Sequence, residues 1–306
     1  MEIRKNEENG NIKITLLKEG KETAKAKCYY TKTPIINGKS IGTIGNIEII
    51  NKEHGKKLLS ECEKIFKEKG IHTIIAPMNG NTWKKYRTLK STNNEPEFLL
   101  ENVYPMEYNT LLETSGFSEC NTYTSNKGKI AQAYYSEAIE KVKSKLKRNN
   151  IVIRKFNKEQ AIEDLTKIYN ISIKSFKKNP YYTDIEKGEF LEQYKQYLTL
   201  IDPEFILIAE KEGKEIGFIF CVPNYNELKI YGEIKTLILK TIAVLPEYEK
   251  LAIGNVILNN IAEIATKKGF KDWIFAFMHS TNTSQKIAKR NKAEIIREYA
   301  LYRKEI

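Results

Sequence analysis

The sequence predicts an α/β (α+β) protein made of two similar halves, each a sheet flanked by helices. The chain has 306 residues, a length that favours two domains over one. Strand-like runs of apolar and β-branched residues alternate with helical patterns in both halves. A basic helical segment, broken by Asn149 and Asn150, lies between them. We therefore expect an N-terminal domain at residues 1–135, a helical linker at 136–150 and a C-terminal domain at 151–306.

The composition is typical of a globular protein, with 41% hydrophobic and 29% charged residues. No run of about 18 apolar residues occurs, so no membrane span is expected. The first residues are charged and lack the apolar core of a signal peptide, so we expect a cytoplasmic protein. The four cysteines are widely separated and form no C-x-x-C motif, so neither a metal site nor a disulfide framework is predicted.

The net charge of +12 raises the question of a polyanionic partner. Only seven of the 51 basic residues are arginine, the residue that makes most bidentate contacts to bases. The arginines form no cluster, and lysines alternate with glutamates along the expected helices, as in residues 64–69. Nucleic acid is therefore not expected as a partner.

The first half is expected to order its elements as hairpin, strand, helix, strand, loop, helix and closing hairpin. Apolar positions recur at helical spacing from Lys52 to Lys69, and Gly70 is typical of a helix end. The expected strands are 11–18, 22–31, 41–50, 71–76 and a closing hairpin of 119–123 and 129–135; 107–116 is a helix and 88–106 a long loop.

The second half is expected to follow the order β-α-α-β-β-β-α-β-α-β. Its helices end in clear signals, such as Lys267-Lys268-Gly269. The expected strands are 151–156, 204–211, 215–222, 235–244, 272–278 and 293–302; the helices are 158–175, 184–200, 251–268 and 282–290, and 225–231 is an irregular connection.

The stretch 244–258 predicts a strand that leads through a tight loop into a helix. The first N–H groups of a helix have no partner within it, and the helix dipole adds positive potential there. A phosphate group can bind at such a place. The N–H groups of Ala252, Ile253, Gly254 and Asn255 are the ones that would point at it, and the alternative is an ordinary turn between a strand and a helix.

This stretch resembles the acetyl-CoA motif of the GNAT superfamily of N-acetyltransferases, Gln/Arg-x-x-Gly-x-Gly/Ala, usually preceded by Val-x-Pro. The matching positions are Val244, Pro246, Ile253, Gly254 and Leu258. The chain departs from the motif at two positions, with Glu249 in place of Arg or Gln and Ala252 in place of the first Gly.

The first half is more weakly similar to the same family. Gly116-Phe117 resembles the Gly-Phe pair that commonly follows the last helix of the family. The junction at 50–58, however, contains Gly55 alone and no Gly-x-Gly loop. The chain is therefore identified as a tandem GNAT-like protein whose first half is degenerate.

The resemblance implies two mixed, mostly antiparallel sheets whose fourth and fifth strands splay apart, with acetyl-CoA as co-substrate of the second half. In the family, the pantetheine arm lies in that gap beside the fourth strand. The residues that the resemblance assigns to the cofactor are Ile242, Ala243, Val244, Lys250, Leu251, Ala252, Ile253, Gly254, Asn255, Val256 and Asn282. Asn282 can equally serve as a helix N-cap.

The catalytic residues of the family are only partly matched. Many members use a glutamate near the fourth strand as base and a tyrosine in the last helix as acid. Positions 236–244 hold no carboxylate, Glu233 lies near their start, and the helix at 282–290 has no tyrosine. His279, at the end of the fifth strand, has a pKa suited to proton relay, although it can also be a surface residue. The candidate catalytic residues are therefore His279 and Glu233, with Tyr225 and Tyr231 as further candidate donors.

The resemblance implies an acetyl-CoA-dependent N-acyltransferase that acetylates a primary amine, either a small molecule or a peptide. Two alternatives remain at this point: an aminoacyl-tRNA-dependent peptidyltransferase, because such enzymes also resemble paired GNAT domains, and a non-catalytic CoA-sensing or interaction module. The sequence specifies neither the acceptor nor an oligomeric state.

Overall fold

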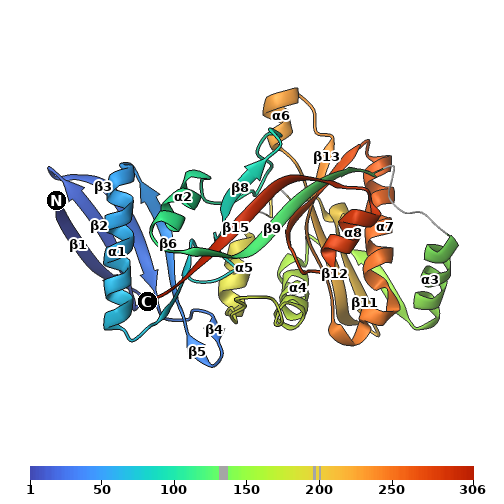
Figure 1. The fold of residues 1–306 in the computed structure, drawn as a ribbon. Coiled ribbons are helices and arrows are strands. Elements are labelled where there is room, and N and C mark those ends of the chain that lie inside the picture. The colour runs from blue at the N-terminus through green and yellow to red at the C-terminus, as the bar shows by residue number, and fades with distance from the viewer. Residues whose placement is uncertain (131–136, 196–197, 200) are drawn as a thin grey trace.

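A computed structural model describes residues 1–130, 137–195, 198–199 and 201–306. Within this part of the chain, strands from both halves join in one 13-stranded mixed sheet (Figure 1). The order along its path is β1-β2-β3-β6-β7-β15-β9-β14-β13-β12-β11-β10, and β8 (Thr88–Thr92) pairs with β15 off this path. The predicted α/β class with helices flanking a mixed sheet is confirmed.

One end of the sheet comes from the first half of the chain. Its strands are β1 (Glu2–Glu8), β2 (Asn11–Lys18), β3 (Lys21–Tyr29), β6 (Gly42–Ile49) and β7 (Thr73–Ala76). A separate small hairpin is formed by β4 (Ile35–Ile36) and β5 (Lys39–Ser40). The apolar face of α1 (Lys52–Glu68) covers this end of the sheet and buries Leu58, Leu59, Cys62, Ile65 and Phe66.

The other end comes from the second half and carries the larger core. Its strands are β10 (Ile151–Lys155), β11 (Ile206–Lys211), β12 (Lys214–Pro223), β13 (Thr236–Val244) and β14 (Asp272–His279). The flanking helices are α3 (Glu137–Arg148), α4 (Ala161–Ser175), α5 (Lys187–Lys195), α6 (Asn226–Tyr231), α7 (Ile253–Lys267) and α8 (Ser284–Arg290), with 3-10 turns η2 (Pro203–Phe205) and η3 (Pro246–Leu251).

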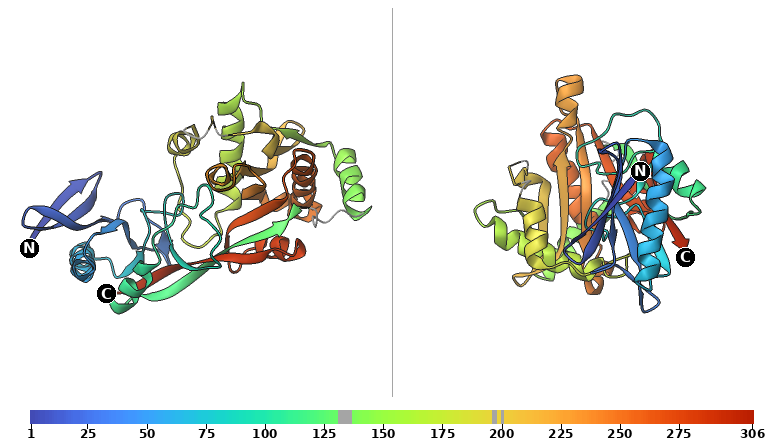
Figure 2. Two further views of the ribbon diagram at one scale, coloured as in Figure 1. Left: turned by 90° about the horizontal axis from the view of Figure 1, so that it is seen from above. Right: turned by 90° about the vertical axis from the view of Figure 1, so that its left-hand side faces the viewer.

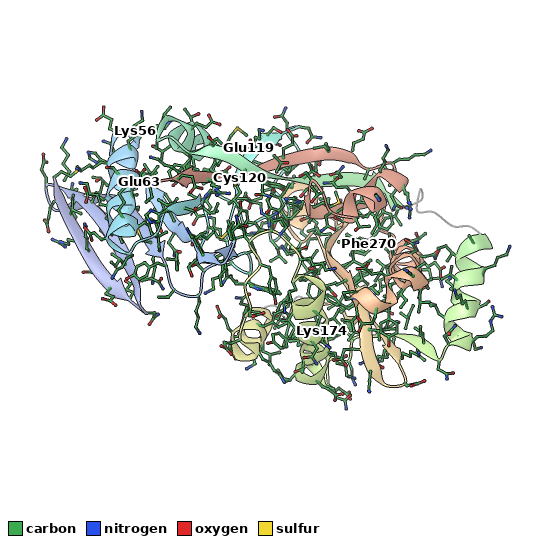
Figure 3. The ribbon with its side chains drawn as sticks, turned by 60° about the horizontal axis from the view of Figure 1, so that its bottom comes forward. Lys56, Glu63, Glu119, Cys120, Lys174 and Phe270 are labelled. Carbon is green, nitrogen blue, oxygen red and sulfur yellow. The ribbon has the colours of Figure 1, made fainter. Side chains whose placement is uncertain are left out.

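Two long strands exchange places between the halves. β9 (Ser118–Lys129) belongs to the first half but pairs with β14, and β15 (Glu294–Glu305) belongs to the second half but pairs with β7. The two strands pair with each other between these positions and run side by side from one half to the other (Figures 1 and 2). Accordingly, Glu119 and Cys120 on β9 lie between Glu63 on α1 and Phe270 in the second half (Figure 3). The two halves therefore share one continuous hydrogen-bonded sheet, while the division of the chain at 136–150 stays a prediction.

The expected closing hairpin of 119–123 and 129–135 is wrong. Residues 118–129 form one uninterrupted strand, and residues 131–135 lie outside the described part of the chain. β15 occupies the antiparallel position that the second arm of the hairpin was expected to take. The helix α2 (Glu107–Thr114) before this strand ends as expected, because Gly116 has a φ of 84° and the Phe117 N–H bonds the Leu112 carbonyl oxygen.

Three further expectations are corrected. The long loop at 88–106 contains β8, which pairs with β15, far away in sequence. The connection at 225–231 contains α6, which ends at Gly232 with a φ of 74°. The helix expected at 184–200 spans Lys187–Lys195, and residues 196, 197 and 200 lie outside the described part.

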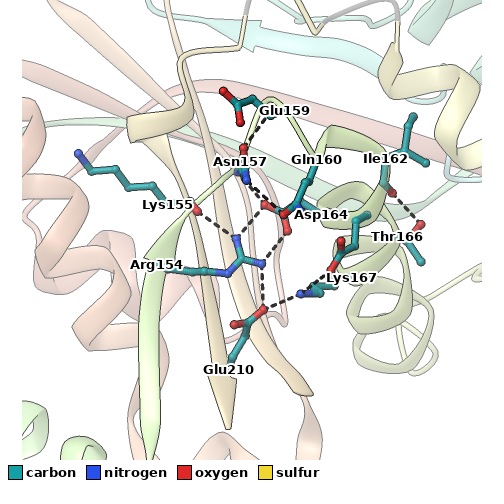
Figure 4. Close-up of polar contacts among 11 residues, drawn as sticks. Arg154, Lys155, Asn157, Glu159, Gln160, Ile162, Asp164, Thr166, Lys167 and Glu210 are labelled. Atoms are coloured by element: carbon teal, nitrogen blue, oxygen red, sulfur yellow. Dashed lines mark hydrogen bonds and ion pairs between the residues drawn. The ribbon is translucent and has the colours of Figure 1, made fainter. Parts of the chain in front are cut away.

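A charged cluster fastens α4 to the sheet (Figure 4). The Arg154 guanidinium on β10 donates to both carboxylate oxygens of buried Asp164, at 2.8 and 2.6 Å. It also donates to Glu210 on β11, which accepts a further bond from Lys167 of α4. Burial opposes the charge on Asp164, but the bonds from Arg154 and from the Asn157 N–H outweigh it and lower the pKa of this carboxyl group.

Replacing Asp164 with alanine is expected to lower the free energy of unfolding by about 3 kcal/mol, because Arg154 then keeps a partly buried charge with one carboxylate partner fewer. Glu163→Ala is the matched control, since its exposed pair with Lys167 should contribute less than about 1 kcal/mol. Urea unfolding at neutral pH measures both. Because the pKa of Asp164 is lowered in the folded state, its contribution is present above its ordinary pKa and is lost as the pH falls through the lowered value. Equal stability losses in the two variants would contradict this assignment.

Candidate functional site

A cavity of about 760 Å³ opens where β13 and β14 part. The two strands pair in parallel from Thr236 opposite Asp272 to Leu239 opposite Phe275, and no further. Beyond that point the pairing of β14 with β9 contains a bulge between Phe275 and Met278. Within it Phe277 takes a φ of 55°, and its N–H donates to Ser125 Oγ. The strands therefore splay as the sequence resemblance implied, and Lys240, Thr241 and Ile242 face the gap from the β13 side.

The cavity is closed on its other side by the first half of the chain. The segment between β7 and β8 contributes Trp83, Tyr86 and Arg87, and the loop after β8 contributes Leu99 and Leu100. Residues around α4 and α5, among them Phe176 and Tyr194, complete an aromatic wall. Both halves of the chain therefore build this one site.

The predicted phosphate loop follows β13 directly. Ala252 has a φ of 56° and precedes the first residue of α7, and its carbonyl oxygen accepts the N–H groups of Asn255 and Val256. The N–H groups of Ile253 and Gly254, in the first turn, have no acceptor within the helix. A Cβ atom built on Gly254 would meet only Ile242 Cδ1 at 3.7 Å and Val244 Cγ2 at 3.8 Å, which are ordinary contacts. Packing alone therefore does not require glycine at this position.

The other residues assigned to the cofactor lie on β13, in η3 and just before α8. Ile242 is partly buried in the cavity wall, Ala243 is buried, and the Val244 carbonyl oxygen accepts a bond from Ser175. Lys250 and Leu251 end the 3-10 turn η3, and Lys250 is exposed. Asn282 lines the cavity, and its side chain accepts the Ser284 N–H at 3.4 Å; the N-cap position of α8 is taken by Thr283.

The corresponding place in the first half is closed. A Cβ on Gly45 of β6 would lie 2.4 Å from both the Met78 carbonyl oxygen and Asn79 Oδ1. Asn79 Oδ1 accepts the Asn46 N–H at 2.7 Å and fills the space between β6 and the chain after β7. The start of α1 is capped by Asn51. This half therefore lacks the gap that the second half has.

His279 lies at the cavity, as expected from its place at the end of β14. Its Nε2 atom is 2.7 Å from Asn121 Nδ2 and its Nδ1 atom is 2.9 Å from Thr281 Oγ1. Burial lowers the pKa of His279, and the positive charge of Arg87 lowers it further, which favours the neutral imidazole. Both ring nitrogens already have protein partners.

Glu233 is not brought to the cavity. It is exposed and pairs with Lys235 just before β13 begins, at the end of the strand away from the splay. Lys240 lies seven positions further along the chain, which corresponds to roughly 23 Å of extended chain. Tyr225 and Tyr231 do not belong to the described cavity lining either.

Lys240 is a site residue that the sequence reasoning missed. Its ammonium group lies 4.4 Å from the centroid of the Phe277 ring, and no carboxylate of the described residues pairs with it. Burial and then the positive charge of Arg87 lower the pKa of Lys240 to about 7. At neutral pH a large share of this amine is therefore uncharged. A lone charged residue within the apolar run 236–244 was the signal for it.

Arg87 is the second missed residue. Its side chain is 7% exposed and its guanidinium stacks against aromatic rings, with Cζ 3.9 Å from the centroid of Tyr86, 4.4 Å from Tyr123 and 4.6 Å from Phe277. Its Nη1 atom is buried and has no hydrogen-bond partner. The local sequence does not mark this residue. Of the three rings around it only Tyr86 is a neighbour in sequence, whereas Tyr123 lies on β9 and Phe277 on β14.

The described lining of the cavity holds four lysine or arginine side chains, Lys84, Lys85, Arg87 and Lys240, and no aspartate or glutamate. The described residues contain no cluster of three or more potential metal ligands. None of the described helices combines the length and the apolar character needed to cross a membrane. The described lining of the site therefore combines aromatic, apolar and uncharged polar side chains with basic ones.

The sequence profile of the Acetyltransferase (GNAT) family matches residues 165–290. No curated protein matches the sequence. The match therefore covers most of the second half, including β13, α7 and the cavity segments on β14 and α8.

Solved structures share the fold along nearly the whole chain. A GCN5-related N-acetyltransferase from Sphaerobacter thermophilus has a TM-score of 0.54 at 12% identity, covering 96% of this chain and 80% of its own. A tandem GNAT protein from the clavulanic acid biosynthesis pathway has a TM-score of 0.53 at 8% identity, covering 96% and 82%. A GCN5-related glucosamine N-acetyltransferase region in a fungal multi-domain GH3 β-N-acetylglucosaminidase has a TM-score of 0.56 at 12% identity. That match covers 96% of this chain, which spans 33% of the fungal protein.

Proposed function

We propose that the protein is an acetyl-CoA-dependent N-acyltransferase acting on a primary amine, because residues 165–290 match the profile of the GNAT acetyltransferase family and the chain shares its fold with a tandem GNAT protein. The observation that carries this proposal is that β13 parts from β14 after Leu239 and leads through η3 to the first turn of α7, where a Cβ atom on Gly254 would lie 3.7 Å from Ile242 of the cavity wall. The gap fits the pantetheine arm, and the free N–H groups of Ile253 and Gly254 fit the pyrophosphate. When bound, acetyl-CoA supplies the acetyl thioester.

The residues of the second half fit this co-substrate in three ways. The backbone of Thr241 and Ile242 lies beside the gap, where an extended arm can bond it as an added strand. Lys250 lies one turn before α7 and offsets the charge of Glu249 toward a phosphate group. The closed gap at Gly45 and Asn79 excludes a second arm from the first half. We therefore expect one acetyl-CoA per chain.

Lys240 is our choice for the general base. An amine must lose a proton before it can attack a thioester, and a base whose pKa lies near the working pH takes that proton most effectively. The Lys240 amine, whose pKa burial and then the charge of Arg87 lower to about 7, lies in the gap itself and has no carboxylate partner among the described residues. His279 is the weaker candidate because both of its ring nitrogens are already bonded within the protein. The proton held by Lys240 then becomes available to the departing thiolate, so that amine and thioester give amide and free thiol.

A titration with acetyl-CoA followed by thermal unfolding tests the proposal. At a cofactor concentration about 100 times Kd, mass action adds about 2.7 kcal/mol to the free energy of unfolding. Release of free thiol in the presence of a panel of amines then reports transfer. Absence of any stabilisation at millimolar acetyl-CoA would refute the proposal. Stabilisation without thiol release for any amine would instead favour the non-catalytic CoA-sensing module.

A further inference from the structure

Arg87 is a buried cation that has no anionic partner among the residues that the structure describes. The comparison within the chain is Arg297, which is 4% exposed and pairs with Glu101 at 3.2 Å. Arg87 is almost as deeply buried, yet no carboxylate among the described residues pairs with it and its Nη1 atom has no hydrogen-bond partner. Burying an unpaired charge is costly, so such groups are normally paired or bind something.

The surroundings of Arg87 hold the guanidinium in place without neutralising it. The centroids of the Tyr86, Tyr123 and Phe277 rings lie 3.9, 4.4 and 4.6 Å from its Cζ atom, so aromatic rings surround the guanidinium, and a ring offers its N–H groups no carboxylate. Its backbone takes a φ of 68°, an uncommon conformation for a residue with a side chain. Two hydrogen bonds fix it there: the Arg87 N–H bonds the Pro77 carbonyl oxygen, and the Arg87 carbonyl oxygen accepts the Tyr104 N–H. The side chain is therefore preorganised toward the cavity that it lines.

The missing anion must come from a ligand, because the described cavity lining contains no acidic side chain. A carboxylate matches the planar fork of a guanidinium in two parallel hydrogen bonds. The pyrophosphate of the co-substrate is expected at the start of α7 instead, whereas Arg87 belongs to the first half and lies beside Phe277 of β14. This leaves the carboxylate of the acceptor as the fitting partner.

Arg87 and Lys240 lie close together. Their charged groups are 4.6 and 4.4 Å from the centroid of one ring, that of Phe277. An acceptor whose carboxylate binds Arg87 therefore brings its amine near Lys240 when only a few bonds separate the two groups. Resting on the acyltransfer proposed above, we propose that the acceptor is an amino acid or a similar small amino-carboxylate, whose carboxylate Arg87 binds and whose apolar part contacts the aromatic wall.

Binding of paired probes without acetyl-CoA tests this inference independently of catalysis. The probes are the N-acetyl derivatives of glycine, alanine, leucine and phenylalanine, each as free carboxylate and as primary amide. We expect at least one carboxylate to bind about tenfold or more tightly than its amide by calorimetry. No carboxylate preference in any of the four pairs would overturn the inference.

Variants then assign the preference to Arg87. Arg87→Met is expected to abolish it, and Arg87→Lys to retain part of it, because lysine keeps the charge but not the bidentate fork. Lys84→Met is the matched control: this lysine also lines the cavity, but it already pairs with Glu189 at 2.7 Å, so the preference should remain. If Arg87→Met does not fold, Arg87→Lys and the wild type still decide the question. An unchanged preference in a folded Arg87 variant would contradict the assignment.

Acetyl-CoA binding to the same variants separates the two proposals. Arg87→Lys should bind acetyl-CoA as the wild type does, within about threefold. A tenfold loss of acetyl-CoA affinity in this variant, with no carboxylate preference in the wild type, would place Arg87 in the co-substrate site and overturn the inference. Carboxylate preference without any acetyl-CoA binding would support the inference about Arg87 and refute the proposed acyltransfer.

Discussion

Replacing Lys240 with methionine is expected to reduce kcat by about 10²–10⁴-fold, the usual contribution of a positioned general base. Methionine preserves the apolar stem beside Phe277 but cannot accept a proton. In the wild type, the pKa of about 7, lowered by burial in the ligand-free protein, predicts that kcat/KM rises with pH up to about 7 and then levels off, as Lys240 loses its proton. Initial rates of thiol release between pH 5.5 and 9 measure both effects.

The same Lys240→Met substitution that lowers activity is expected to raise the free energy of unfolding. The pKa of this amine is lower in the folded than in the unfolded chain, so between about pH 7 and 10 the unfolded state binds more protons, and stability rises with pH. Lys240→Met removes that cost and should therefore be more stable than the wild type at pH 7, although it is nearly inactive. Lys235→Met is the control, because this lysine stands exposed just before the same strand, and both properties should stay unchanged. A Lys240 variant with full activity would exclude the residue as base.

Replacing Gly254 with tryptophan is expected to abolish stabilisation by acetyl-CoA, which amounts to about 2.7 kcal/mol at a ligand concentration of about 100 Kd. The second residue of α7 has space for a Cβ atom, so the fold should tolerate the change. The larger side chain would occupy the place where a phosphate group approaches the N–H groups of the helix. Thermal unfolding with and without acetyl-CoA measures the loss.

The control for Gly254 is Gly188→Trp in α5, where a Cβ atom meets nothing within 4 Å, and stabilisation by acetyl-CoA should persist. Gly254→Ala adds a graded test, since a single methyl group makes only ordinary contacts and should weaken binding less than tryptophan does. Full stabilisation of Gly254→Trp by acetyl-CoA would show that the phosphates bind elsewhere.

Local features of this protein could be predicted from sequence, because the interactions that produce them lie within a few residues. The order of β13, the loop and α7 follows from apolar patterning and helix-start chemistry between residues 236 and 268, and the structure agrees with it closely. The end of α2 at Gly116 and Phe117 is another such case.

The exchange of β9 and β15 could not be predicted in this way. Each strand has the same pattern whether its partner is the neighbouring arm of a hairpin or a strand about 170 residues away. For the same reason the hairpin at 119–135 was the natural but wrong expectation, and β8 was missed.

Only some of the residues of the candidate site could be predicted from the sequence. Lys240 stands out as a charge inside an apolar strand, and its place on that strand is enough to bring it to the gap. Arg87 becomes meaningful only when β9 and β14 supply its rings, and a pairing between distant strands creates that arrangement. Glu233 was chosen for its position in sequence, but seven residues of extended chain separate it from the part of β13 that lies at the gap.

The shared strands also constrain how this protein is made in the cell. β7 acquires its neighbour β15 only after residues 294–305 have left the ribosome, more than 200 residues after β7 itself. At about 5–20 residues per second, that interval is on the order of ten seconds or more. During it the nascent first half exposes an open sheet edge to other chains, a state that promotes aggregation and engages chaperones. Cutting the gene between the halves would leave each fragment in that state permanently.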